Sequence, residues 1–171
     1  MGNLPRRSLG RRGAVIVKSP TELAQALKPG ERVFGLDLGE KTIGIALCDL
    51  MLSIATPLET IAKRKFAIDS DVLIGLIKKH NVGGLVIGLP LNMNATEGPS
   101  AQSARAFARN FEAKHPMPIL FWDERLSTAA VTRTLIEADV SRAKRKEVVD
   151  KMAAAYILQG VLDFLTRSSR A

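Results

Sequence analysis

The fold is decided by the stretch RVFGLDLGEKTIGIALC, residues 32–48. Residues 32–38 predict a strand, Gly39-Glu40 a turn, and residues 41–48 a second strand. In the second strand, large apolar residues alternate with small ones, a period of two that predicts a hairpin arm with one face closely covered. An acidic residue, Asp37, lies at the end of the first strand.

Turn, capping and periodicity signals on either side of the hairpin predict the remaining elements. They are a helix from Ser19 to about Leu27, a strand near residues 53–61, a helix at 66–79, a strand at 85–89, a helix at 99–114, a strand at 118–122, and helices at 127–138 and about 144–165. Hairpin strands followed by strands that alternate with helices predict an α/β fold with a mixed, helix-flanked sheet of five strands.

Length and composition limit the class of protein. A chain of 171 residues fits one domain. We expect a basic N-terminal arm with a short helix over residues 1–31 and the folded domain over residues 32–171. No apolar run approaches the roughly 20 residues of a membrane span, so we expect no membrane association. The single cysteine, Cys48, fits a reducing cytoplasm.

Positive charge is concentrated in three parts of the sequence. The net charge is +8, and residues 1–20 hold five basic residues and no acid. Two further clusters lie at residues 63–65 and 142–146. Basic patches attract phosphate polyanions, which makes nucleic acid a candidate partner. An ordinary solvated surface explains the charge equally well.

Four acidic residues stand where a ligand could bind. Asp37 ends one predicted strand, Asp123-Glu124 ends another, and Asp150 begins the apolar stripe of the last helix. Strand ends of a helix-flanked sheet are where ligands usually bind. A carboxylate in line with an apolar stripe is costly to bury without a partner, and a shared cation would supply one. Oxygen ligands suit Mg²⁺ or Mn²⁺.

Each acid also has a structural explanation. Asp37, followed by Gly39, fits a turn, and this is the more frequent role of such a pattern. Asp123 could cap the following helix, while Glu124 could face water. Asp150 could pair with a lysine of its own helix, which stabilises by only a few tenths of a kcal/mol.

Four motifs in order resemble the YqgF family, Holliday-junction-resolvase-like nucleases of the RNase H fold for which a role on pre-16S ribosomal RNA is suggested. They are Gly35–Ala46, Gly88–Asn94, Asp123–Thr128 and Val149–Gln159, and the resemblance covers about residues 32–165. One departure is Ala95, where the family usually has glycine. If that position has a positive φ, Ala95 costs about 1 kcal/mol.

The resemblance implies a metal-dependent nuclease. Asp37, Glu124 or Asp123, and Asp150 would hold Mg²⁺ or Mn²⁺, because the strand ending in Gly88-Leu89-Pro90 offers no acid. Hydrolysis would then be metal-assisted. Three further residues are expected to contact substrate: Arg125, Asn92 and Lys41. For Arg125 a salt bridge to a neighbouring acid is an equal alternative.

The expected substrate is structured RNA, and branched DNA is the alternative. We expect a ribosome precursor as the partner, and a monomer or a homodimer as the assembly. A non-catalytic, ribosome-associated RNA-binding module is the stronger rival class. Retention of three acidic positions favours the enzyme, because a pure binder would gain from losing acids that face phosphate. A sugar-kinase-like protein is disfavoured, because it needs two such domains and a second Asp-x-Gly loop.

Overall fold

The computed structural model describes residues 16–126 and 142–169, with side chains described from residue 151 onward in the second range. Its elements are β1 (Ile16–Val17), α1 (Pro20–Ala26), β2 (Arg32–Leu38), β3 (Thr42–Cys48), β4 (Ala55–Ala62), α2 (Phe66–Lys79), β5 (Val82–Leu89), α3 (Pro99–Lys114), β6 (Ile119–Asp123), a 3₁₀ turn (Glu124–Leu126) and α5 (Arg142–Ser169). The helix expected at 127–138 lies outside the described residues.

The strands form one mixed sheet in the order β1-β6-β5-β2-β3-β4. The β2–β3 and β3–β4 pairs are antiparallel, whereas β5 runs parallel to β2 and β6 runs parallel to β5. The predicted α/β fold with a mixed sheet is therefore confirmed. The sheet has six strands rather than the five expected, because β1 adds to the edge by pairing in parallel with β6. A strand of two residues is too short to produce a periodic signal in the sequence.

The segment before β2 packs against the sheet. The side chain of Ser19 accepts a hydrogen bond from the Glu22 N–H at 3.2 Å, the N-cap that the sequence predicts for α1. Leu23 of that helix is only 1% exposed, so α1 contributes to the core. Residues 16–27 thus belong to the packed body, although the sequence places them in the arm. Residues 1–15 lie outside the described part of the chain.

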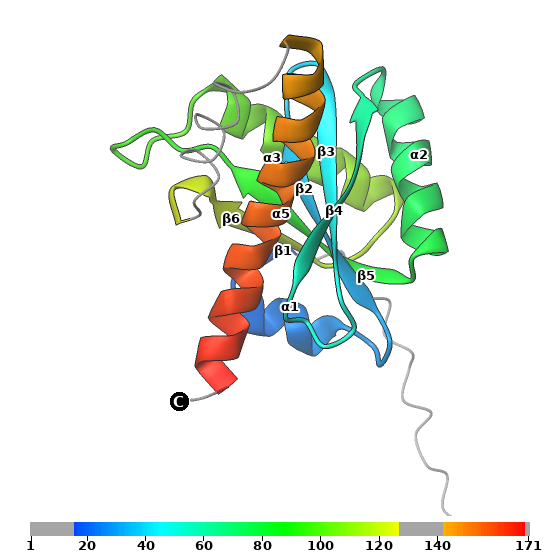
Figure 1. The fold of residues 1–171 in the computed structure, drawn as a ribbon, viewed down its shortest axis with the longest axis vertical. Coiled ribbons are helices and arrows are strands. Elements are labelled where there is room, and N and C mark those ends of the chain that lie inside the picture. The colour runs from blue at the N-terminus through cyan, green and yellow to red at the C-terminus, as the bar shows by residue number, and fades with distance from the viewer. Residues whose placement is uncertain (1–15, 127–141, 170–171) are drawn as a thin grey trace, which may run out of the picture.

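Each face of the sheet is covered by different helices (Figure 1). Helices α1 and α5 cover the face that holds Val33, Val86 and Leu120, whereas α2 and α3 cover the opposite face. Helix α5 approaches closely, since a Cβ built on Gly35 would lie 2.7 Å from the Ala154 carbonyl oxygen. Among the described helices, none is both long and apolar enough to cross a membrane.

One end of the sheet gathers the parts of the chain that carry the candidate residues. Parallel strands β2, β5 and β6 all end there. The β2–β3 turn, the end of β4 and the starts of α2 and α5 lie at the same end, at the top of Figure 1. Ligands bind beyond the carboxyl ends of strands in such sheets.

Candidate active site

Asp37 is a buried carboxylate on the α5 face of the sheet. It is the last but one residue of β2 and is 5% exposed. Gly35, two residues earlier, contacts Ala154 and Leu158 of α5. Because side chains two apart on a strand share a face, Asp37 also faces α5. The strand-end location predicted for Asp37 is thus observed, with its side chain directed into the body of the protein.

Glu124 lies over the strand next to Asp37. A Cβ built on Gly88 of β5 would meet Glu124 Oε1 at 2.8 Å and Ile157 Cδ1 of α5 at 2.5 Å. The register that pairs Leu36 with Ile87 puts Gly88 beside Asp37. Neighbouring strands are about 4.8 Å apart, so the Glu124 carboxylate lies about one strand away from Asp37 on the same face. The structure therefore brings these two acids together.

The backbone of α5 carries Asp150 to the same level. Val161, Leu162 and Leu165 lie beside Val33 at the start of β2, and Ala154 lies against Gly35, so α5 runs antiparallel to β2. Asp150 precedes Ala154 by four helical residues, which is about 6 Å along the helix axis. Asp37 follows Gly35 by two strand residues, which is about 6.6 Å. The backbones of Asp150 and Asp37 therefore lie at the same level.

The side chain of Asp150 lies outside the described residues, so its role as the third acid stays a prediction. Among the side chains of residues 16–126 and 151–169, no three His, Cys, Asp or Glu residues form a group that could hold a metal ion. Asp150 has a backbone position that matches the Asp37–Glu124 pair.

Asp123 lies on the other face of the sheet. It pairs with Leu89, whose side chain packs in the core beneath α2 and α3. Arg125 donates to both carboxylate oxygens, with Nη2 at 2.6 Å from Oδ2 and Nε at 3.0 Å from Oδ1. These hydrogen bonds from Arg125 lower the pKa of Asp123. The structure does not bring Asp123 to the Asp37 face.

Arg125 also holds the segment that follows β5. Its Nη1 donates to the carbonyl oxygens of Asn92 at 3.5 Å and Met93 at 3.3 Å. Between the phosphate contact and the salt bridge that the sequence leaves open for Arg125, the observed contact is the salt bridge with Asp123. The guanidinium links the end of β6 to the loop beyond β5.

Residues 91–97 form a compact hairpin beside the acids. Asn92 Nδ2 donates to Thr96 Oγ1 at 2.9 Å, and this hydroxyl donates to Asn94 Oδ1 at 2.6 Å. The expected substrate residue Asn92 thus stabilises the hairpin through its side chain. Met93, at the tip, is 98% exposed. Ala95 has a φ of 66°, so the positive φ considered at this position is observed.

Lys41 lies in the exposed β2–β3 turn, on the side of Asp37 opposite to the hairpin of residues 91–97. Its carbonyl oxygen accepts a hydrogen bond from the Lys63 N–H at 2.8 Å. Since only two residues separate β2 from Lys41, the lysine remains close to the strand end that carries Asp37. Its expected contact with substrate is compatible with this location and stays a prediction.

The part of the sequence that forms this fold matches a known family. The family described as "RuvX: Holliday junction resolvase" matches residues 31–164. The chain belongs to the RuvX family. This confirms the family predicted from the four sequence motifs.

Named relatives in the RuvX family are close. A protein of Paramagnetospirillum magneticum is 57% identical over 147 residues, covering 86% of this chain and 95% of its own. One of Methylocella silvestris is 59% identical over 146 residues, covering 85% and 91%. Both bear the name "Putative pre-16S rRNA nuclease".

A solved structure supports the fold. T. thermophilus RuvC in complex with a Holliday junction substrate superposes with a TM-score of 0.51 at 9% identity, covering 80% of this chain and 96% of that one. At this identity the likeness concerns the fold alone, and it confirms the predicted RNase H-like architecture.

One residue of this RuvX-family site, Gly88, was not selected by sequence reasoning. Gly88 entered only as part of the Gly88–Asn94 motif and of a strand end that has no acid, and no role was assigned to it. The structure shows that the missing side chain provides the space for the Glu124 carboxylate and Ile157. A glycine at the end of an otherwise apolar strand, facing a helix with small residues, was the available signal.

Proposed function

We propose that the chain is a divalent-metal-dependent nuclease that hydrolyses phosphodiester bonds of pre-16S ribosomal RNA. The observation that carries the proposal is the convergence of Asp37 and Glu124 over the side-chain-free Gly88. Family membership supports the reaction class, and the names of the relatives support the substrate. We place the activity in the cytoplasm, with a ribosome precursor as the partner.

The donor set fits a hard divalent cation. Asp37 and Glu124 offer only oxygen atoms, and Asp150 would add a third carboxylate from α5. Two carboxylates about 4 Å apart repel by about 4 kcal/mol at an effective dielectric of 20, so a cation stabilises such an arrangement. Oxygen ligands favour Mg²⁺ or Mn²⁺ over Zn²⁺.

Different residues of the site would have different roles in the reaction. Asp37, Glu124 and Asp150 would hold the ion, which supplies Lewis-acid chemistry for water activation and phosphate neutralisation. Asp37 gives the site a fixed position, because it lies on a central strand and is buried. Asp123 and Arg125 fix the hairpin of residues 91–97 at one side of the acids. Lys41 attracts phosphate at the other side.

Branched DNA is the second candidate substrate. The description of the RuvX family names a Holliday junction resolvase, and the RuvC structure of the same fold holds such a junction. Both substrates present phosphodiester backbones to the same acids, so the alternative changes the nucleic acid and leaves the proposed chemistry in place.

The test is a cleavage panel of the purified protein on a pre-16S RNA fragment, single-stranded RNA and a four-way DNA junction. Each substrate is incubated with Mg²⁺, Mn²⁺ or EDTA. We expect metal-dependent cleavage of the RNA fragment. Preference for the junction would assign the chain to the second candidate. Binding without cleavage of any substrate would contradict the nuclease and favour the RNA-binding module.

Adjacent acids provide matched variants for the site. Glu124→Gln and Asp37→Asn remove charge at nearly constant shape and should lower the cleavage rate by roughly 10²–10³-fold, as the loss of one charge-stabilising group does. Asp123→Asn removes the neighbouring charge on the opposite face and should cost much less activity. Equal losses in Asp123→Asn and Glu124→Gln would contradict the choice of Glu124 as ligand.

A further inference from the structure

We infer that a basic corner, formed by Lys41, Lys63, Arg64 and Lys65, binds the phosphate backbone of the substrate strand on the β4 side of the cleavage position. The inference rests on the proposed function for the identity of the partner, a nucleic acid. It adds a surface that would guide the strand away from the acids, at the side opposite to the hairpin of residues 91–97.

The basic corner is joined to the strand that carries Asp37. Lys63 Nζ donates to the Gly39 carbonyl oxygen at 3.1 Å, and the Lys63 N–H donates to the Lys41 carbonyl oxygen at 2.8 Å. Gly39 is two residues beyond Asp37, a span of about 6.6 Å along a strand. One strand of B-form DNA carries a phosphate every 3.4 Å or so of helix axis, so the corner would meet phosphates a few nucleotides from the acids.

The loop between β4 and α2 is fixed in place by a buried acid. Asp69 is 4% exposed, and its two carboxylate oxygens accept hydrogen bonds from the Arg64 N–H at 3.0 and 3.1 Å. The Asp69 N–H in turn donates to the Lys65 carbonyl oxygen at 3.1 Å. The carboxylate is thereby directed to the backbone, while the side chains of Arg64 and Lys65 are exposed. A preformed loop loses less conformational entropy when it binds a ligand.

The charge of the corner is available to a polyanion. In the described part of the chain the ion pairs are Arg105–Glu97, Lys114–Asp71 and Arg125–Asp123, and none of them includes a corner residue. Two acids accompany these four cations, Glu40 in the turn next to Lys41 and the buried Asp69 beside Arg64, so the corner keeps a positive balance. The loop also precedes α2, whose N-terminal end adds partial positive charge.

Helix α2 supplies a matched control. Lys78 and Lys79 are also an exposed basic pair, but they lie in the last turn of α2, before β5 begins at Val82. The helix therefore separates two exposed basic pairs, Arg64-Lys65 beside the candidate site and Lys78-Lys79 at the far end of the sheet. Removing either pair changes the net charge by the same amount.

The test measures binding in EDTA, so that cleavage plays no part. Affinity for a fluorescein-labelled RNA hairpin with a single-stranded tail is measured by anisotropy at several salt concentrations. We compare wild type, Arg64→Gln/Lys65→Gln and Lys78→Gln/Lys79→Gln. Two lost phosphate contacts should flatten the slope of log K against log salt by about 1.4 to 1.8 in the first variant. The second variant should keep the slope of wild type.

The outcomes separate the corner from the proposed catalysis. Equal slopes for all three proteins, or equal flattening in both variants, would overturn the corner as a binding surface. Flattening in the corner variant alone, with no cleavage of any substrate by wild type, would retain the corner and contradict the nuclease. Tight binding of an acidic peptide by the corner in place of RNA would overturn the choice of partner. Melting temperatures check the fold, and the Asp69 bonds use only the backbone of Arg64.

Discussion

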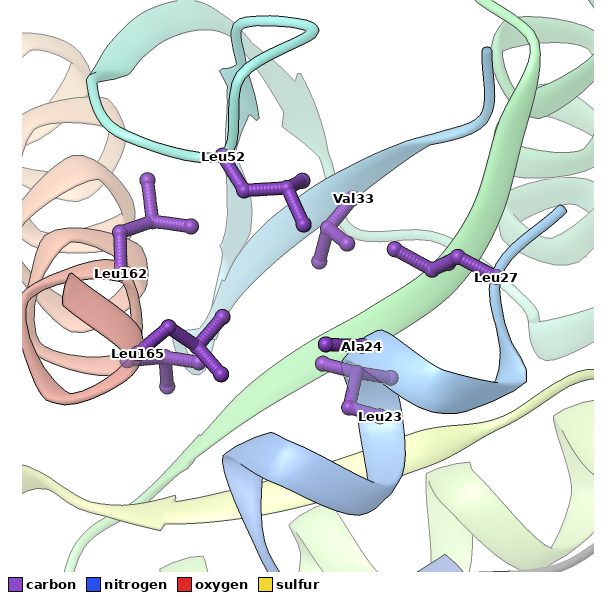
Figure 2. Close-up of a pocket in the computed structure, with 8 residues that line it drawn as sticks. Leu23, Ala24, Leu27, Val33, Leu52, Leu162 and Leu165 are labelled. Carbon is purple, nitrogen blue, oxygen red and sulfur yellow. The ribbon is translucent and has the colours of Figure 1, made fainter. Parts of the chain in front are cut away.

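The two ends of the sheet differ in the side chains that gather between their elements. At the end where β2, β5 and β6 finish, the Asp37 and Glu124 carboxylates lie near Gly88, the Arg125 guanidinium lies on one side and the basic corner on the other. At the other end a cleft between α1 and α5 is lined only by apolar residues (Figure 2): Leu23, Ala24, Leu27, Val33, Leu52, Val161, Leu162 and Leu165. Apolar side chains of the β3–β4 turn are exposed nearby, including Met51 at 82%.

The acids of the two ends also differ. At the apolar end, Asp49 accepts hydrogen bonds from the N–H groups of Ser53 at 2.7 Å and Ile54 at 3.0 Å. These hydrogen bonds lower the pKa of Asp49 to about 2, and the bond from the Ile54 N–H contributes most. Its charge therefore stabilises its own turn. Asp37 and Glu124 converge instead on one another across two strands. We therefore expect substitutions at the apolar end to lower stability, and substitutions at the end that holds Asp37 to lower activity.

The largest expected effect comes from shortening the apolar end. Deletion of residues 1–27 removes β1 and the buried Leu23, and loss of one such leucine alone costs about 2–5 kcal/mol. Deletion of residues 1–15 removes four arginines ahead of β1 and should lower RNA affinity with little change in the melting temperature. Thermal denaturation of both truncations measures the difference in stability between them. Equal losses of stability would mean that α1 adds nothing to the core.

Two glycines that contact α5 should respond differently to alanine. In Gly35→Ala the new Cβ meets the Ala154 backbone oxygen, so the helix must shift, and overpacking should cost about 1–3 kcal/mol. In Gly88→Ala the new Cβ meets the ends of the Glu124 and Ile157 side chains, which can move. Gly88→Ala should therefore lose cleavage activity with a smaller loss of stability. Denaturant unfolding and cleavage rates distinguish the two, and the reverse order would contradict the location of Glu124.

Divalent metal should stabilise the end that holds Asp37. Binding to the native state alone contributes about 1.4 kcal/mol at ten times Kd, which raises the melting temperature of a domain of this size by roughly 3–5 °C. Asp150→Asn should be more stable than wild type in EDTA, having lost one repelling charge, and should respond less to Mg²⁺. Asp49→Asn, at the other end, should keep the full response. An unchanged response in Asp150→Asn would remove it from the site.

The smallest expected effect concerns the hairpin of residues 91–97. Ala95 has a positive φ, so Ala95→Gly should stabilise the protein by about 1 kcal/mol. The same substitution in the middle of α3, Ala106→Gly, should destabilise by a similar amount, because glycine disfavours a helix interior. Opposite shifts in melting temperature are the expected result. A loss of stability in Ala95→Gly would show that the alanine side chain contributes to the hairpin.

Local patterns predicted most of the fold. The period of two in residues 41–48 identified β3, and the capping signal at Ser19 identified the start of α1. The edge strand β1 was missed, because two residues become a strand only through their partner Ile119 and its neighbour in β6. The packing of α1 against α5 was missed for a related reason, since the burial of Leu23 depends on residues far away in the sequence.

The candidate site was predicted in its residues and less well in its arrangement. Asp37 and Glu124 lie where a shared role requires, but the sequence left the choice between Asp123 and Glu124 open, because it does not give the residue at which β6 ends. Strand β6 ends at Asp123, which pairs with Leu89 of the α2–α3 face, and the 3₁₀ turn that begins at Glu124 carries its carboxylate over Gly88 on the other face. The partners of Arg125 are likewise tertiary contacts, and a pattern of residue types could indicate only that an acid was near.

The side-by-side acids at the end of β6 impose a constraint on how the protein can change over evolutionary time. Asp123 braces the hairpin through Arg125 on one face, and Glu124 reaches over Gly88 on the other. Loss or gain of a single codon within residues 119–123 would move the following side chains of this strand to the opposite face. Asp123 and Glu124 would exchange faces while the composition stayed almost the same. Lineages should therefore tolerate point substitutions in this strand far more readily than changes in its length.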